Sequence, residues 1–561
     1  MTYPGSRSCP VRLPCLLSLF CLTFFLLIVP AGALAAAEEL PAEEVQAVST
    51  GGLVLIDWII IVTYAGGTIA LGYWFSRRQN DTSEYFTGGG HMNPLLIGVS
   101  LFATLLSTIS YLSMPGEVAG KGPVGMLMIL WLPIIYCITS FWLLPVYMKQ
   151  RVTSAYELLE KKLGLSIRLL GAVMFLALRL VWMSLLVYLA AEAMTVMLGV
   201  DKTWIPTIVL VTGLVSVVYT SLGGLQAVVI TDFLQTVLLF GGAWLVIGVI
   251  TLDFGGFGWI PTEWHPAWDS QPFFSTNPST RVTVVGSLLT TVIWFVATIG
   301  GDQTSVQRFM ATEDASAARR ALKAQLTCSA LVAITLTLVG FALLAWFTKH
   351  SSALPAGIDP RAGADLLFPR FISFHLPPGV SGLVVAAMFA AAMSSIDSGV
   401  NSITAVVMTD FLDRFGLRPE TEKGHVRASQ LLALVIGGTV VFGSSFIGNI
   451  PGNITEVTQK TVNLLVTPIF CLFVYALFIP FSRVPGVLAG TVAGLVTATL
   501  IAFSGPLFGT NPVTGYDPVS FQWIGPAALV VNLAVGCTVS LLCPGTAGDS
   551  VEPADLAEAD S

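Results

Sequence analysis

The sequence predicts an all-α polytopic membrane protein that crosses the bilayer about 13 times. Of its 561 residues, 54% are hydrophobic and only 11% are charged, whereas a soluble domain carries roughly 25% charged residues. The mean hydropathy is +0.81, and apolar windows of about 20 residues recur from residue 53 onward. Such a chain is solvated mainly by lipid. Its net charge of −7 does not indicate nucleic-acid binding, which requires a basic surface.

The two ends of the chain lie outside these windows. Residues 1–35 have the pattern of a secretory signal peptide, with a basic start, an apolar run and a small-residue cleavage motif ending at Ala35. An additional transmembrane helix is the alternative. The remaining segments are an extracytoplasmic N-terminal segment at 36–52, a membrane domain at 53–543 and an acidic, solvated cytoplasmic tail at 544–561.

Each expected span is an apolar window long enough to cross the hydrocarbon core, which takes about 20 helical residues. The fourth and ninth windows are long enough to project beyond the bilayer. No connection is long enough to form a separate domain. The spans are expected at 53–75, 94–118, 124–148, 166–198, 203–222, 225–251, 282–301, 321–348, 378–410, 428–449, 456–480, 484–505 and 523–543.

The basic residues predict which side of the membrane each connection faces. If the chain starts outside, its inner loops hold sixteen Lys and Arg residues, Arg308 among them, and its outer loops hold six. This bias satisfies the positive-inside rule. The expected topology is N-terminus out and C-terminus in, in the cell membrane.

The ninth span carries a carboxylate among hydroxyls in an otherwise apolar stretch. With 3.6 residues per turn, Ala391, Ser394, Asp397, Ser398 and Asn401 share one face. An ionised Asp at the bilayer centre costs about 2.5–3.5 kcal/mol, so such residues face the bundle interior and mark ion or substrate pathways. Oxygen ligands suit a small hard cation, although hydroxyls alone can also hold helices together. The pattern favours a cation-coupled transporter.

Two other segments carry polar groups at membrane depth. The stretch 103–111 holds four hydroxyls and leads into Met114-Pro115-Gly116, which predicts a broken helix whose freed carbonyls face a cavity. A proline kink packed against a neighbouring helix is the alternative. Gly223-Gly224 makes a tight turn before the sixth span. Asp232 lies about two turns into that span and, taken alone, is a stray helix-end carboxylate.

Four motifs in order resemble the sodium:solute symporter family over about residues 53–505. The resemblance implies the LeuT-type inverted repeat of five helices, here over spans two to eleven, and sodium-coupled transport by alternating access. It makes 53–543 a transporter domain. The motifs are Gly223-Gly224…Asp232…Gln235, Gln307-Arg308-Phe309…Arg319, Ser394-Ser395…Ser398…Asn401-Ser402…Asp410, and Pro468…Phe473 with Pro480 and Gly486…Gly490.

The resemblance also implies where Na⁺ binds. The usual site of the family uses three backbone carbonyls and two hydroxyls, which here belong to Ala103, Leu106, Ala391, Ser394 and Ser395. Some members have a second site, whose positions here are Asp232, Asp397 and Ser398, with Ser394 shared. Many relatives carry Ser where this chain has Asp397. That carboxylate could strengthen a second cation site, or it could titrate and admit a proton.

The solute is expected to be a small carboxylated molecule. The second span lacks the acidic and amide residues that sugar-transporting relatives use, and its Ser107, Thr108 and Ser110 resemble the branch that handles monocarboxylates and sialic acid. Arg179 in the fourth span could pair with the solute carboxylate. It could instead be structural, with Glu192 or a carbonyl as its partner.

Other classes of protein fit the sequence less well. The sequence has no P-loop, which disfavours a primary pump, and no selectivity loop, which disfavours a channel. It also has no catalytic Ser/His/Asp pattern and no His/Glu metal pattern, so we do not expect an enzyme. The expected partners are a small solute, sodium ions and lipid, with no nucleic acid. The alternatives are a sodium-coupled symporter of a sugar or other neutral solute, and a sensor derived from a transporter.

Overall fold

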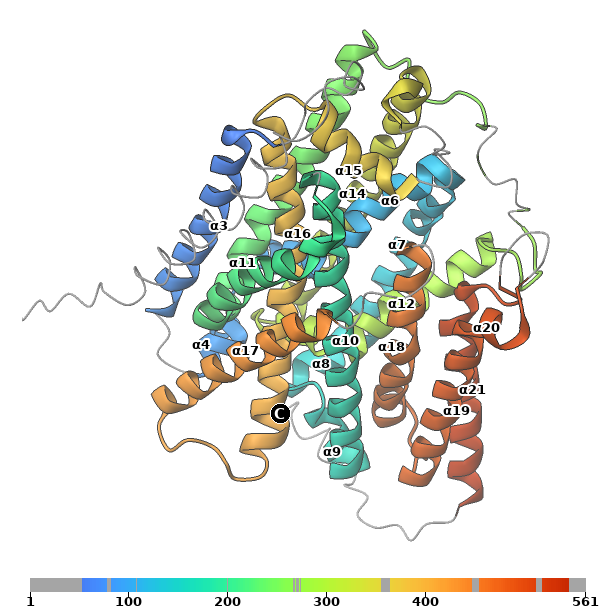
Figure 1. Cartoon of the computed structure of the whole chain (residues 1–561). Helices are drawn as coiled ribbons and strands as arrows, with labels where there is room; N and C mark the ends of the chain where they lie inside the picture. Colours follow the sequence, from blue (N-terminus) through green and yellow to red (C-terminus); the bar gives the residue numbers. More distant parts are fainter. Residues whose placement is uncertain are drawn as a thin grey trace, which may run out of the picture.

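The computed structural model describes residues 53–77, 82–106, 108–198, 200–265, 268, 272, 274–354, 364–445, 454–510 and 517–543. These residues are helical with short connections, and no strand occurs among them. Most of the helices lie lengthwise side by side, with α3 at one edge of the bundle and α19 and α21 at the opposite edge (Figure 1). The expected signal peptide, N-terminal segment and acidic tail fall outside the described residues.

The helix bounds follow the apolar windows closely. The helices are α3 Leu55–Ser76, α4 Thr82–Thr87, α5 Pro94–Leu105, α6 Thr108–Lys121, α7 Met128–Ile138, α8 Leu144–Gln150, α9 Glu157–Leu163, α10 Leu165–Leu198, α11 Ile205–Asp253, α12 Val284–Gly301, α13 Gln303–Met310, α14 Ala315–Lys349, α15 Ala364–His375, α16 Val380–Val406, α17 Glu422–Ser444, α18 Ile454–Phe478, α19 Val484–Ala502, α20 Ser504–Phe508 and α21 Ile524–Leu542. A π-helical turn, Val407–Asp413, continues α16.

Ten helices in the described part of the chain are long and apolar enough to span a membrane, or up to 11 if one bent pair counts as a single span. The helix α11 covers two expected spans and changes direction at Gly224, whose φ of 57° and ψ of −164° are accessible to glycine and strained for other residues. The structure therefore confirms an all-helical polytopic protein. The count of 13 and the orientation stay predictions.

The second span is broken, as the sequence predicted, but the break lies before Pro115. The bent pair α5 and α6 meets at 62°, and the break follows Leu105, where Leu106 is extended. Pro115 lies inside α6. A Cβ at Gly340 of α14 would stand 2.8 Å from the Pro115 carbonyl oxygen, so the proline turn packs directly on α14. The broken helix predicted for this stretch is confirmed, although its break precedes Pro115 and the proline itself packs against α14.

A second break separates α12 from α13. Asp302 has an extended conformation, and its side chain accepts a hydrogen bond from the Thr304 amide, which caps the short helix α13. The helix α12, of 18 residues, therefore ends at this break, and the separate helix α13, of 8 residues, begins directly after Asp302. The motif Gln307-Arg308-Phe309 lies on α13.

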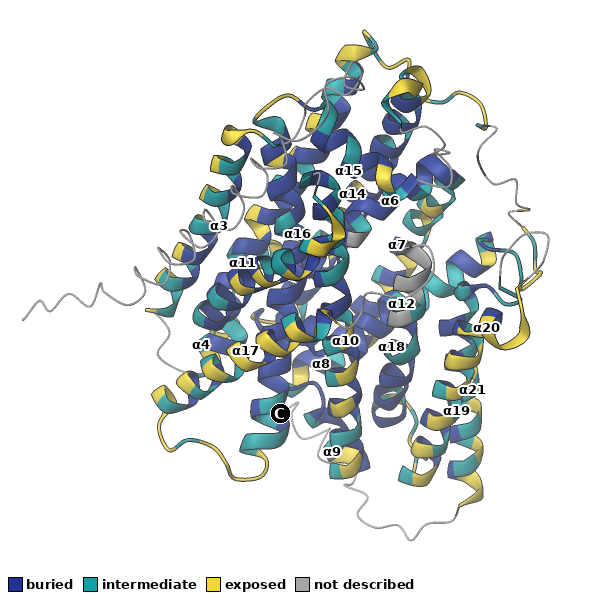
Figure 2. Cartoon of the chain, viewed as in Figure 1, coloured by how far each residue is buried: buried dark blue, intermediate teal, exposed yellow. Residues whose placement is uncertain are grey.

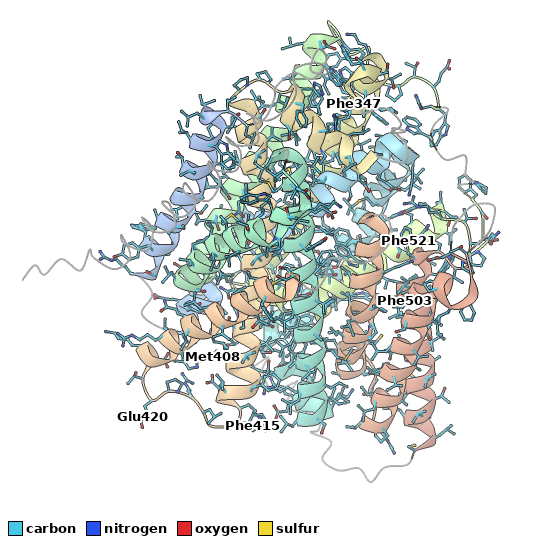
Figure 3. The ribbon with its side chains drawn as sticks, in the orientation of Figure 1. Phe347, Met408, Phe415, Glu420, Phe503 and Phe521 are labelled. Atoms are coloured by element: carbon cyan, nitrogen blue, oxygen red, sulfur yellow. The ribbon has the colours of Figure 1, made fainter. Side chains whose placement is uncertain are left out.

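The helix α16 is the centre of the bundle, and most of its residues are buried (Figure 2). It runs lengthwise. Met408, just past its end, and Phe347 of α14 lie towards opposite ends of the bundle (Figure 3). Near its last turn, Asp410 accepts hydrogen bonds from Arg168 Nε at 2.7 Å and Ser154 Oγ at 2.5 Å. These contacts fix one end of α16 to α10.

The other end of α16 is capped by α3. The Asp57 carboxylate accepts hydrogen bonds from the amides of Gly379 at 2.7 Å and Gly382 at 2.8 Å, and from the Val54 amide at 2.9 Å. A carboxylate at a helix N-terminus satisfies otherwise unpaired N–H groups and complements the helix dipole. A Cβ at Gly382 would stand 2.5 Å from the Asp57 Cα, so the two helices touch backbone to backbone.

Replacing Asp57 with Ala should lower the free energy of unfolding by about 1–3 kcal/mol, because buried amide donors of α16 lose their acceptor. Thermal unfolding of the purified protein in detergent measures this loss. Thr63→Ala, at an exposed position of the same helix, is the matched control and should melt like the native chain. Equal melting temperatures for the two variants would contradict the proposed cap.

Candidate cation and substrate site

The first predicted sodium site lies where the α5 break faces α16. Ser394 Oγ donates a hydrogen bond of 2.6 Å to the Ala103 carbonyl oxygen, so a carbonyl of the broken helix and a hydroxyl of α16 are in contact. Ser395 Oγ is buried and has no hydrogen-bond partner. Leu106 follows the last residue of α5 and has left the helical conformation. Ala391 is fully buried one turn before Ser395.

A second polar cluster lies behind this contact, between α5, α11, α13 and α16. Asp232 Oδ2 accepts a hydrogen bond of 2.5 Å from Ser100 Oγ, and Ser100 in turn accepts one of 2.8 Å from Arg308 Nε. The Arg308 guanidinium also lies 3.4 Å from Asp232 Oδ2 and donates to Ser398 Oγ at 2.5 Å. Ser398 is 2.8 Å from Thr104 Oγ1. Every member is buried.

Arg308 was expected in an inner loop, and this expectation is wrong. The break at Asp302 turns α13 into the bundle, so Arg308 is 0% exposed and carries the positive charge of the cluster. Within the sequence, the only indication was its place in the Gln307-Arg308-Phe309 motif. A charge buried inside a membrane protein needs a partner of opposite charge. Here that partner is Asp232, which is 76 residues away along the chain and so is not indicated by the local sequence.

Asp397 has different partners from Asp232. Its Oδ1 accepts hydrogen bonds from Ser216 at 2.6 Å and Thr220 at 2.5 Å, both on α11. Its Oδ2 is buried without a hydrogen-bond partner, as is Asp232 Oδ1. Asp397 forms no ion pair with any residue that the structure describes. The two carboxylates of the predicted second sodium site therefore each present one unpartnered oxygen.

The predicted solute residues begin α6, directly after the break. Thr108 Oγ1 is buried and donates a hydrogen bond of 3.1 Å to the Met388 carbonyl of α16. Ser110 is half-buried, and Ser107 lies outside the described residues. The first turn of α6 holds no acidic residue. The N-terminus of α6 therefore lies against α16 at Thr108.

Arg179 has a structural partner, although not the one considered from the sequence. Its guanidinium forms an ion pair with Asp302 and donates a hydrogen bond of 2.6 Å to Thr304 Oγ1. Glu192 is bound by Lys202 at 2.7 Å instead. Thirteen helical residues separate Arg179 from Glu192, which is about 20 Å along α10. The pairing with Asp302 favours the structural role that the sequence also allowed.

A polytopic helical bundle with a broken span, buried hydroxyls and buried paired charges is the architecture of an ion-coupled secondary transporter. The chain belongs to the sodium:solute symporter family, whose model matches residues 85–494. The resemblance found in the sequence is thereby confirmed. This membrane protein is a sodium-coupled transporter and not an enzyme.

Characterised relatives cover most of the chain. It is 26% identical over 473 residues to the sodium/sialic acid symporter SiaT of Proteus mirabilis, which covers 81% of this chain and 90% of that protein. It is 28% identical over 452 residues to the sodium/sialic acid symporter NanT of Aliivibrio fischeri, covering 79% and 86%. A solved substrate-bound, outward-open Na⁺-coupled sialic acid symporter shares the fold, with a TM-score of 0.72, 24% identity and coverage of 87% and 98%.

Removing either partner of the Arg308–Asp232 pair should cost about 3–5 kcal/mol of stability, because a buried charge loses its counter-charge. The double variant Arg308→Gln with Asp232→Asn should lose less than the sum of the two single losses. Thermal unfolding of all three variants in sodium-free detergent measures the coupling.

The matched control for this cycle is Arg418→Gln, which breaks an exposed pair with Glu422. It should change stability by at most about 1 kcal/mol. Strictly additive losses at Arg308 and Asp232 would show that the two charges do not interact.

Proposed function

We propose that this protein is a symporter that uses sodium to take up a small carboxylated organic solute by alternating access. The contact between the α5 break and the hydroxyl face of α16 carries this proposal, because Ser394 and Ala103 meet there. The same break places the N-terminus of α6, which begins at Thr108, next to α16. The cation and solute sites therefore share one broken helix, so occupancy of one site affects the shape of the other.

The first sodium ion is assigned to the carbonyls of Ala103, Leu106 and Ala391 and the hydroxyls of Ser394 and Ser395. The unpartnered Ser395 hydroxyl supports this assignment, since a buried polar oxygen without a partner costs free energy that a bound cation would recover. All five groups are hard oxygen ligands, which suit Na⁺. Sodium here would favour the outward-open state and order the solute site.

The solute carboxylate is assigned to Ser107, Thr108 and Ser110. The N-terminus of a helix carries unpaired N–H groups and a partial positive charge, and half-helix N-termini in transporters of this type bind anionic groups. Two relatives named as sialic acid symporters fit this choice, since sialic acid is a carboxylate. Arg179 is already neutralised by Asp302 and would support the site from behind.

A second cation is assigned to Asp232, Asp397 and Ser398, with Ser394 shared. The unpartnered oxygens Asp232 Oδ1 and Asp397 Oδ2 support it, because two buried carboxylates need more positive charge than one guanidinium supplies.

The membrane orientation belongs to the same proposal. We place the N-terminus outside and the C-terminus inside, with residues 1–35 as a signal peptide, 36–52 outside, 53–543 as the transporter domain and 544–561 as a cytoplasmic tail. The positive-inside rule supports this orientation. So do the Lys and Arg residues of α9 and of the connection after α16, two elements that lie at the same end of the bundle (Figure 1). About 13 spans and an inverted five-helix repeat are proposed on the basis of the apolar windows and the shared fold.

Replacing both hydroxyls of the first site, Ser394→Ala with Ser395→Ala, should raise the sodium concentration needed for half-maximal uptake at least about tenfold. Each lost hydroxyl removes a ligand to a charged species, typically about 1.5–3 kcal/mol. Uptake of labelled solute into proteoliposomes at varied sodium measures it. Thr404→Ala on the same helix, whose hydroxyl binds only its own helix carbonyl, is the control. An unchanged sodium requirement in the double variant would show that these two hydroxyls do not bind sodium.

Thr108→Val should weaken the uptake of carboxylated solutes about tenfold, since it removes a donor to a charged group while keeping the shape. Competition of sialic acid, short monocarboxylates and neutral sugars against a labelled carboxylate measures both affinity and class. Thr212→Val removes a hydroxyl that binds its own helix at Ile208 and should leave uptake unaltered. If neutral sugars compete and carboxylates do not, the solute is a neutral sugar and the proposed carboxylate class is wrong.

A further inference from the structure

Arg308 occupies the place where a second sodium ion is proposed. The guanidinium lies 3.4 Å from Asp232 Oδ2 and 2.5 Å from Ser398 Oγ, and both residues are proposed ligands of that ion. Its other contacts are Ser100 Oγ at 2.8 Å and the Thr304 carbonyl at 3.1 Å. All four contacts are oxygens. The guanidinium is therefore bound by oxygen atoms, which are also the ligands that a hard cation prefers.

The two carboxylates proposed for the second site differ in their counter-charges. Arg308 pairs with Asp232, and Arg179 is paired with Asp302. Asp397 receives hydrogen bonds only from neutral hydroxyls. A buried carboxylate without a counter-charge is stabilised by a bound cation or by a proton, so Asp397 can accept one further positive charge while Arg308 already supplies the counter-charge of Asp232.

The bond that holds the guanidinium to the carboxylate is long. A charge-assisted N–H···O contact is usually about 2.7–2.9 Å, against 3.4 Å between Arg308 and Asp232. Arg308 also lies on a helix of 8 residues that follows a break at Asp302. Because Gln307 of the same helix is hydrogen-bonded to Asn401 and Ser402 of α16, withdrawal of the guanidinium requires a change in the conformation of the Arg308 side chain or in these contacts.

We propose that Arg308 is a tethered cation that fills the second sodium site, and that sodium binds there only when the guanidinium withdraws. This proposal rests on the second site proposed above. Arg308 then sets the sodium affinity of that site. When sodium is absent, the guanidinium compensates the Asp232 carboxylate, and when sodium is present, the ion must displace a positive charge that is part of the chain. Removing the competitor should strengthen sodium binding, whereas removing a purely structural residue should weaken it.

The experiment is equilibrium binding of radioactive sodium to the purified full-length protein in detergent, in the absence of solute. We expect two sodium ions per chain, one bound more weakly. In Arg308→Gln the weaker step should become at least about tenfold tighter, a change of about 1.4 kcal/mol. Sodium should also raise the melting temperature of Arg308→Gln more than that of the native chain, because a ligand of the folded state stabilises it in proportion to its affinity.

Arg168→Gln is the matched control, because it also removes a largely buried guanidinium from an ion pair with an aspartate. It should leave the weaker sodium step unchanged. If it tightens that step as much as Arg308→Gln does, the effect is long-range charge alone and the proposal is overturned. Arg308→Lys is the second variant, in case Arg308→Gln does not fold. Its compact ammonium keeps the charge but cannot span Ser100, Asp232 and Ser398 together, so a smaller tightening is expected.

The outcomes separate this proposal from the proposed function. A folded Arg308→Gln or Arg308→Lys whose weaker sodium step is unchanged or weaker overturns the tethered cation. A native chain that binds one sodium ion, with no second ion gained in either Arg308 variant, also overturns it but leaves the first sodium site intact. Loss of all sodium binding in the native chain would instead contradict the proposed cation sites as a whole.

Discussion

The cost of burying charge in a lipid-solvated bundle is the constraint on which this structure depends. Four of the buried aspartates that the structure describes are compensated by specific groups: Asp232 by Arg308, Asp302 by Arg179, Asp410 by Arg168 and Asp57 by backbone amides. These partners come from different helices, so each ion pair or cap also fixes two helices relative to one another. Asp397 is the exception, with two hydroxyls and no counter-charge. The exception lies on the helix that carries the proposed cation ligands.

Much of the fold was accessible from the sequence because lipid imposes a simple rule on it. Every buried backbone group must be satisfied within a helix, so apolar windows predict helices almost directly, and the long fourth and ninth windows correspond to the long helix α10 and to α16 with its π-helical turn. The positions of Ser394 and Ala103 followed from the family motifs, and the structure brings the two residues together. Their binding of sodium stays a prediction.

The differences from the sequence predictions share a different cause. Proline usually ends a helix, yet Pro115 continues α6 because it packs on Gly340 of α14, and no local pattern shows that contact. Arg308 reads as a loop residue, because basic residues near helix ends usually face the cytoplasm. Only its distant partner Asp232 explains its burial, and the same is true of Arg179 and Asp302. Local patterns predicted helices well, whereas side-chain pairing across the bundle depends on the tertiary arrangement.

The cap that Asp57 places on α16 has a consequence for motion. Alternating access requires groups of helices to rotate as bodies, and the boundaries of those bodies are set by the contacts too costly to break in each cycle. The helix α3 is joined to the start of α16 by two hydrogen bonds to the Asp57 carboxylate, from the amides of Gly379 and Gly382, and by backbone contact at Gly382. Breaking that junction would leave donors unpaired twice per transported molecule. The contacts at Asp57 and Gly382 therefore join α3 to the helix that carries Ala391, Ser394 and Ser395, so these two helices are expected to move together.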